Sequence, residues 1–202
     1  MEIEQEVNDI CTNPLTYAEL NIRNKVVVLK SGMGETCILA QKMVGAEGYV
    51  VGVEQNEEYV KQAETNVKNM HLHNIHFIKA DVDNIPVNYG VADKVLAQCA
   101  FSRKESLTQG CMEIFKMLAP FATCVISDVV AEVQPLTWAA HHFHTRREYV
   151  ECMQDLGFEN IEIREEQKVE FAGISQLKQH TFFKLVITAQ KPQPCKGCSG
   201  CQ

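Results

Sequence analysis

The chain has little positive charge for its length. Its 202 residues include 19 Lys and Arg against 26 Asp and Glu, which gives a formal net charge of −7 and a pI near 5.5. Proteins that hold nucleic acids or anionic membranes by electrostatics cluster Lys and Arg on one surface. The composition therefore argues against nucleic-acid and membrane partners and favours a small molecule.

Long apolar runs and a leader peptide are missing as well. No run approaches the roughly 20 apolar residues that span a bilayer, and the first residues, MEIEQEVNDICTN, have neither the basic nor the apolar region of a signal peptide. We therefore expect a cytoplasmic protein. Because nine cysteines occur without a secretory signal, thiols in the core, at a metal or at a reacting centre are favoured over disulfides.

A glycine-rich nucleotide loop is present only in part. Residues 26–54 predict a buried strand, a glycine turn, a helix and a second strand that ends on an acidic residue. Gly32 and Gly34 allow a tight turn and a close approach of the backbone to a ligand, and Glu54 can accept both hydroxyls of a ribose. The third glycine of a dinucleotide site is missing, because Glu35 follows Gly34. The pattern favours a pocket for a nucleoside-bearing cofactor.

Apolar strands and amphipathic helices alternate along the first two thirds of the chain. Strands are predicted at residues 26–30, 49–53, 75–79, 92–97 and 123–128, and helices at residues 2–10, 37–44, 56–70 and 105–118. This order predicts an α/β fold with a doubly wound, mostly parallel sheet and right-handed crossovers.

The last third has a different pattern. A helix at residues 145–156 precedes strands at 161–164 and 181–189, and the lack of a clear crossover helix between them suggests an antiparallel pair at the sheet edge. We expect one domain over residues 1–190, in which residues 1–24 form an N-terminal cap, and a flexible Cys-rich tail over residues 191–202.

Polar residues gather where the first four strands end. The carboxyl ends of parallel strands meet at one edge of a sheet, so these residues are expected to surround one ligand. Asp81 can accept from an exocyclic amine, and the backbone N–H of Val82 can reach a ring nitrogen, as adenine recognition requires. The candidate cofactor-binding set is Ser31, Gly32, Gly34, Glu54, Gln55, Asp81, Val82 and Gln98, with Cys99 beside it.

Over roughly residues 25–189 the chain resembles the class I S-adenosylmethionine-dependent methyltransferases, and within them the arsenite methyltransferases. The resemblance is carried by CTNPLTYAEL, SGMGETCILAQKMVGAEGYVVGVE, KVLAQCAFS and VISDVV. It implies a Rossmann-like methyltransferase fold with a seven-stranded sheet whose last strand is antiparallel, and S-adenosyl-L-methionine as cofactor. Cys11 and Cys99 fall on the metalloid-binding cysteines of that family, which makes them the candidate catalytic residues.

The chemistry implied by this resemblance is the in-line transfer of a methyl group to a small thiophilic acceptor. Two or three thiolates would hold trivalent arsenic, a soft centre, with its lone pair aimed at the methyl group. No general base is required, because the arsenic carries its own lone pair. The thiols would need pKa values below the ordinary value of about 8.5.

The chain departs from the family at two places. Val28 and Lys30 replace the usual acidic residue of the first strand and a glycine two residues later, and Phe121 and Ala122 replace a glycine pair before the fifth strand. The acidic residue helps to hold the cofactor's ammonium group, so its loss weakens the contacts of the cofactor site. Two alternatives stay open. One is a methyltransferase-fold protein with weakened or lost catalysis that binds a soft metal or metalloid. The other is methyl transfer to a carbon, oxygen or nitrogen acceptor.

Further Cys and His residues are candidates for a metal site. His141, His142 and His144 stand near the place of the family's third cysteine and suit zinc or copper; the alternative, which we favour, is a polar loop with exposed or locally bonded histidines. The candidate tail ligands, Cys195, Cys198 and Cys201, recur at three-residue spacing and can converge on one soft ion or metalloid. Cys37 opens a helix, where the helix dipole favours a thiolate. The oligomeric state is not indicated.

Overall fold

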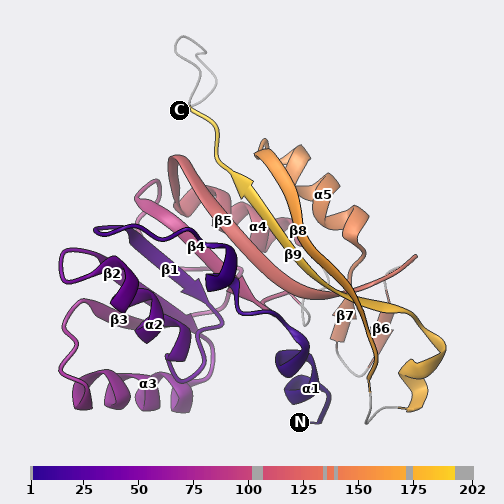
Figure 1. The fold of residues 1–202 in the computed structure, drawn as a ribbon, viewed down its shortest axis with the longest axis horizontal. Coiled ribbons are helices and arrows are strands. Elements are labelled where there is room, and N and C mark those ends of the chain that lie inside the picture. The colour runs from indigo at the N-terminus through magenta and orange to yellow at the C-terminus, as the bar shows by residue number, and fades with distance from the viewer. Residues whose placement is uncertain (1, 102–106, 134–135, 139–140, 172–174, 194–202) are drawn as a thin grey trace.

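The computed structural model describes residues 2–101, 107–133, 136–138, 141–171 and 175–193, and these form one α/β domain (Figure 1). A seven-stranded sheet has the strand order β3-β2-β1-β4-β5-β9-β8. Strands β1 (Lys25–Leu29), β2 (Tyr49–Glu54), β3 (Ile75–Lys79), β4 (Ala92–Gln98) and β5 (Leu118–Ala131) are parallel to one another. The predicted doubly wound, mostly parallel sheet is thus confirmed.

The antiparallel strand lies one place inside the sheet edge. Strand β9 (Phe182–Gln190) pairs antiparallel with β5 on one side and with β8 (Glu159–Val169) on the other. The antiparallel pair predicted at the C-terminal end of the chain is therefore present, and β8 forms the edge. Strand β8 extends well beyond the predicted residues 161–164, because it pairs with β9 over most of its length. The additional residues are mostly polar and lack the alternation of apolar side chains by which a strand is recognised in a sequence.

Helices cover both faces of the sheet (Figure 1). Helices α2 (Glu35–Val44) and α3 (Glu57–Asn69) pack on one face, and α4 (Leu107–Met117) and α5 (Arg146–Asp155) on the other. The side chains of Val26–Leu29 alternate between the two cores and are all buried, which explains why this strand is a continuous apolar run.

Polar caps set where helices α3 and α5 begin. The Asn56 side chain accepts from the backbone N–H of Glu58 at 2.9 Å, as its position before two acidic residues predicts. Thr145 and Glu148 form a reciprocal capping box at the start of α5. The Asn56 cap begins α3 directly after β2, at the carboxyl edge of the sheet.

Some short elements were not predicted. They are two 3₁₀ helices, η1 (Pro14–Tyr17) and η2 (Ser175–Gln179), and a hairpin of β6 (Leu136–Trp138) with β7 (His141–Phe143). Phe143 at the end of β7 is fully buried against Phe171 and Phe182. Contacts between residues so distant in the chain, rather than local periodicity, stabilise the end of this hairpin.

The N-terminal segment begins with the predicted helix, α1 (Glu2–Ile10). Val7 and Cys11 at its end are buried in a third apolar cluster with Cys99 and Val129. Helix α1 therefore lies over the carboxyl edge of the sheet, near the ends of β4 and β5 (Figure 1). Within the described ranges no helix is long and apolar enough to cross a lipid bilayer.

Candidate active site

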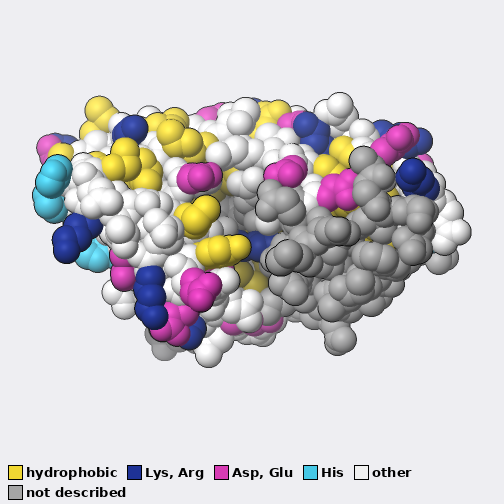
Figure 2. Space-filling model, turned by 90° about the horizontal axis from the view of Figure 1, so that it is seen from below, with side chains coloured by type: hydrophobic (Ala, Val, Ile, Leu, Met, Phe, Trp, Pro, Cys, Tyr) yellow, Lys and Arg dark blue, Asp and Glu magenta, His cyan; other side chains and the backbone are white. Residues whose placement is uncertain are grey.

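A cleft of about 850 Å³ opens at the carboxyl ends of strands β1 to β4. Figure 2 shows this face of the molecule, with a hollow near its middle, a basic side chain inside it and acidic side chains around it. The cleft lies within the usual range of small-ligand sites, about 300–1,000 Å³. Its lining includes the predicted residues Ser31, Gly32, Glu54, Gln55, Asp81, Val82, Gln98 and Cys99.

Glu54 organises the glycine turn. Its carboxylate is 6% exposed and accepts from the backbone N–H of Gly32 and of Asn56, both at 2.9 Å. Each carboxylate oxygen can accept a second hydrogen bond, and the residue lines the cleft. Glu54 therefore joins the loop after β1 to the end of β2 and retains acceptor capacity for hydroxyl groups of a ligand.

Asp81 and Val82 form the wall at the end of β3. The Asp81 side chain accepts from the backbone N–H of Asp83 at 3.1 Å, and Asp81 forms an isolated bridge with Asn84, so the turn is held in a fixed shape. Val82 is 9% exposed and packs into the main core. A carboxylate and an apolar side chain at adjacent positions provide a polar and an apolar contact for a base.

The two glycines of the turn have different roles. Gly32 has φ +54°, and a Cβ placed on it would have no atom within 4 Å, so its backbone faces open space. Gly34 has φ +88°, and a Cβ there would lie 2.7 Å from Phe77 and 3.2 Å from Ala63. Gly34 thus permits close packing against β3 and α3, whereas Gly32 contributes backbone to the cleft.

These geometries predict different effects of alanine at the two glycines. Gly34→Ala combines left-handed backbone strain with overpacking, so we expect a loss of about 2–4 kcal/mol of unfolding free energy. Gly32→Ala should lose only about 1 kcal/mol but should weaken ligand binding, because the new methyl group enters the cleft. Urea denaturation and calorimetric titration of both variants measure these effects. Equal losses of stability would contradict the assigned roles.

Ser31 and Cys37 face each other behind the loop. The Ser31 hydroxyl oxygen would lie 2.8 Å from a Cβ on Gly52 of β2, so this side chain points toward the sheet. Ser31 therefore contributes its backbone, rather than its hydroxyl group, to the lining of the cleft. Cys37 is fully buried, and burial raises the pKa of its thiol well above the ordinary value. The expectation of a thiolate at Cys37 is therefore wrong: desolvation outweighs the helix dipole.

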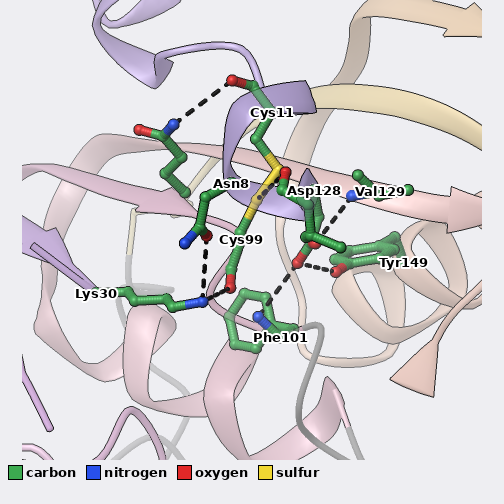
Figure 3. Close-up of a disulfide and its surroundings, with 10 residues drawn as sticks. Asn8, Cys11, Lys30, Cys99, Phe101, Asp128, Val129 and Tyr149 are labelled. Atoms are coloured by element: carbon green, nitrogen blue, oxygen red, sulfur yellow. Dashed lines mark hydrogen bonds between the residues drawn. A yellow bond between two sulfur atoms is a disulfide. The ribbon is translucent and has the colours of Figure 1, made fainter. Parts of the chain in front are cut away.

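Lys30 extends its side chain into the cleft at the end of β1. Its ammonium donates to the carbonyl oxygen of Cys99 at 3.2 Å and to the side-chain oxygen of Asn8 at 3.4 Å (Figure 3). Its φ of +53° is unusual for a residue other than glycine. Among the described residues that line the cleft, Lys30 is the only Lys or Arg.

Cys99 lines the end of the cleft, and Cys11 lies directly beside it. They are joined as a disulfide with a Cα–Cα distance of 6.5 Å (Figure 3). Both are buried, and the Val7 carbonyl oxygen lies 3.4 Å from the Cys99 sulfur. The sequence favoured free thiols. Helix α1 and the turn after β4 bring the two sulfurs within bonding reach although 88 residues separate them.

Asp128 is a site residue that the sequence did not single out. It lies on β5 in the segment VISDVV, and its carboxylate oxygen and the two sulfurs of Cys11 and Cys99 are within 4.8 Å of one another. The carboxylate accepts from Tyr149, Phe101 and Val129 (Figure 3). Burial raises the pKa of Asp128, while these hydrogen bonds and the charge of Lys30 oppose the shift. The only sequence signal was an acidic residue within a buried strand.

The other metal candidates receive less structural support. His144 is buried, and its ring packs edge-on against Tyr149 at 6.2 Å, but the Cys11, Cys99 and Asp128 group does not include it. The side chains of His141 and His142 and the tail residues Cys195, Cys198 and Cys201 lie outside the described part of the chain. A metal site at these positions stays a prediction.

The two departures from the family pattern lie in different places. Phe121 and Ala122 are near the start of β5, and Leu118 there pairs with Ala92 at the start of β4. Because the cleft is at the opposite, carboxyl end of these strands, this change does not reach the ligand site. Val28 is buried within β1, and Lys30 enters the cleft. The departure that bears on the ligand is the one in the first strand.

One half of this cleft offers open space and hydrogen-bond acceptors of the kind that an adenosyl group requires. The open space above Gly32 and the carboxylates of Glu54 and Asp81 provide room and acceptors at the ends of β1, β2 and β3. The other half, between Lys30 and Cys99, carries a cation where the family pattern has a glycine. A doubly wound sheet with an antiparallel β9 and a cleft at the carboxyl ends of its strands agrees with the architecture that the resemblance to S-adenosylmethionine-dependent methyltransferases implies.

Comparison with known proteins agrees with this class. Residues 24–184 match a family model described as a methyltransferase domain. Since the match covers well over half of the chain, the protein belongs to this methyltransferase domain family. The predicted class of methyltransferase and its S-adenosyl-L-methionine cofactor are thus confirmed at the level of the family.

Curated relatives include an arsenite methyltransferase from Halobacterium salinarum. It is 27% identical over 163 residues, which cover 76% of this chain and 42% of that protein. A ubiquinone/menaquinone biosynthesis C-methyltransferase from Blochmanniella floridana is 24% identical over 115 residues, or 56% of this chain and 45% of that protein. The chain thus spans less than half the length of both relatives.

Solved structures show the same fold. An arsenic(III) S-adenosylmethionine methyltransferase from Chlamydomonas reinhardtii superposes with a TM-score of 0.74 at 16% identity, and the match covers 93% of this chain and 73% of that one. The YcgJ protein from Bacillus subtilis gives a TM-score of 0.72 at 12% identity over 89% of this chain and 97% of that one. At these identities the likeness defines the fold alone.

Proposed function

We propose that the protein transfers a methyl group from S-adenosylmethionine to a small thiophilic acceptor of the arsenite type. The observation that carries this proposal is the pairing of Cys11 with Cys99, which lines the end of the cleft. The likeness to arsenite methyltransferases in sequence and fold supports the same acceptor class.

In this proposal, residues at different positions around the cleft bind different parts of the cofactor and the acceptor. Glu54 and Asp81 would hold the ribose and base, and the backbone at Gly32 would approach the ligand. The bound cofactor supplies an electrophilic methyl group. Cys11 and Cys99, as thiolates, would hold the acceptor at the cleft end, so that its lone pair faces that methyl group. Burial of both cysteines excludes water from the acceptor.

The pair must be reduced to bind a thiophilic acceptor. The disulfide takes up two electrons and two protons from an external dithiol or glutathione to give two thiols. Condensation of two thiols with arsenite then forms two As–S bonds and releases two waters. A cytoplasmic location, which the sequence predicts, would supply the reducing conditions.

The experiment is a methyl-transfer assay with separate readouts for cofactor and acceptor. Protein reduced with dithiothreitol is incubated with methyl-labelled S-adenosylmethionine and arsenite, and arsenic species are separated and quantified by mass spectrometry. We expect one S-adenosylhomocysteine for each methyl group found on arsenic. Cofactor binding without methylated arsenic would reject the acceptor, and the absence of cofactor binding would reject the enzyme.

A second candidate function is capture of a soft metal or metalloid without methyl transfer. The position of Lys30 in the cleft favours it, because a cation there opposes a cationic cofactor. In that case reduced protein should retain arsenite, zinc or copper near one equivalent after gel filtration and show no turnover. Turnover in the assay above would reject this alternative.

A further inference from the structure

The order of the strands determines which residues would lie along a bound adenosyl ligand. Asp81, Glu54, Lys30 and Cys99 follow β3, β2, β1 and β4, which are successive neighbours in the sheet. A ligand whose base and ribose lie at Asp81 and Glu54, and whose tail reaches toward the cysteine pair, therefore crosses the end of β1. Lys30 directly follows β1 and lines the cleft at this point.

The ammonium of Lys30 is held at this position by two acceptors from other elements. Asn8 belongs to α1, and the Cys99 carbonyl belongs to the turn after β4 (Figure 3). Lys30 is also close enough to Asp128 for its charge to act on that carboxylate. The cation is thus located between the adenosyl half of the cleft and the cysteine pair, and it is not directed toward bulk solvent.

We infer that Lys30 is a specificity-determining residue, which makes the cleft discriminate against the sulfonium cation of S-adenosylmethionine and in favour of the neutral thioether S-adenosylhomocysteine. The inference rests on the proposed function, because it assumes that the adenosyl half of the cleft binds these ligands. The two ligands share the adenosyl and amino-acid groups and differ by one methyl group and the positive charge on sulfur. A cation in a partly desolvated cleft repels the first and not the second.

The test compares three ligands on matched variants by isothermal titration under reducing conditions. Lys30→Met keeps the length of the side chain and removes its charge. Lys42→Met removes the same charge from an exposed position on α2 outside the cleft and serves as the control. The ligands are S-adenosylmethionine, S-adenosylhomocysteine and 5′-methylthioadenosine, which lacks the amino-acid group and reports on the adenosyl half alone.

In Lys30→Met, the ratio of the dissociation constant of S-adenosylmethionine to that of S-adenosylhomocysteine should fall about tenfold relative to wild type. Lys42→Met should keep the wild-type ratio, and affinity for 5′-methylthioadenosine should stay within about twofold in both variants. Lys30→Gly, which suits the φ of +53° at this position, should repeat the fall if Lys30→Met folds poorly.

The outcomes separate this inference from the proposed function. Ligand binding with an unchanged ratio in Lys30→Met and Lys30→Gly would overturn the role of Lys30 and leave the enzyme proposal intact. Absence of binding of all three ligands to wild type and to both Lys30 variants would overturn the two together. Binding of S-adenosylmethionine gained only in the Lys30 variants would support the inference and would reject methyl transfer by the wild type.

Discussion

Replacement of Cys99 by serine is expected to reduce methyl transfer to a thiophilic acceptor at least about 100-fold. A hydroxyl group is a poor ligand for a soft centre, and a misplaced acceptor loses the alignment that in-line transfer requires. Cys11→Ser should have an effect of the same order, since the two sulfurs lie together at the cleft end. Initial rates with saturating arsenite, measured in dithiothreitol, remove any contribution from the disulfide.

Cys152→Ser is the matched control for these substitutions. Cys152 lies on α5, is half-buried and does not line the cleft, so its variant should retain wild-type activity. Binding of S-adenosylhomocysteine should be unchanged within about twofold in Cys11→Ser, because this residue does not line the cleft. Full activity of Cys99→Ser on a carbon, oxygen or nitrogen acceptor would instead identify a methyltransferase unrelated to metalloids.

The adenosyl half of the site was predictable because its residues follow strands with strong local patterns. Glu54 ends the buried run YVVGVE, and Asp81 follows FIKA. Once the strands are recognised, the parallel order places their carboxyl ends at one edge without further information. In the structure Glu54 and Asp81 line the same cleft.

The cysteine end of the site was predictable only in part. The resemblance identified Cys11 and Cys99, but Asp128 is recognised only from contacts made across the fold. Tyr149 on α5 and Phe101 after β4 both donate to it, and neither is close to Asp128 in the sequence. Periodicity describes residues within one element, so it carries no signal for a polar group shared by three elements.

The direction of the Lys30 side chain could not be predicted from the sequence either. A lysine after a buried strand usually reaches solvent, and the glycine turn gives no reason for it to turn inward. The acceptor at Asn8 exists because α1 folds back over the sheet edge. The position of α1, which local sequence does not fix, thus provides one of the two acceptors that hold the Lys30 ammonium in the cleft.

Removal of the Asp128 carboxylate is expected to be the most destabilising single change near the site. Asp128→Ala would leave two backbone N–H groups and the Tyr149 hydroxyl without their acceptor in a buried place. The expected loss is about 3–5 kcal/mol of unfolding free energy. Tyr149→Phe removes one donor and leaves the carboxylate in place, so it should lose about 1 kcal/mol. Urea denaturation at pH 7 measures both.

The pH dependence of stability distinguishes the charge of Asp128 from its hydrogen bonds. Burial raises its pKa above the ordinary value of 3.8, so between that value and the raised one the folded protein binds more protons than the unfolded chain. Stability therefore falls as pH rises through this window. Asp128→Asn cannot titrate, so the wild type should lose stability relative to this variant as pH increases above about 4. A gain relative to Asp128→Asn over the same range would show that the three donors and the charge of Lys30 outweigh desolvation, and that the carboxylate beside the cysteine pair is held as an anion.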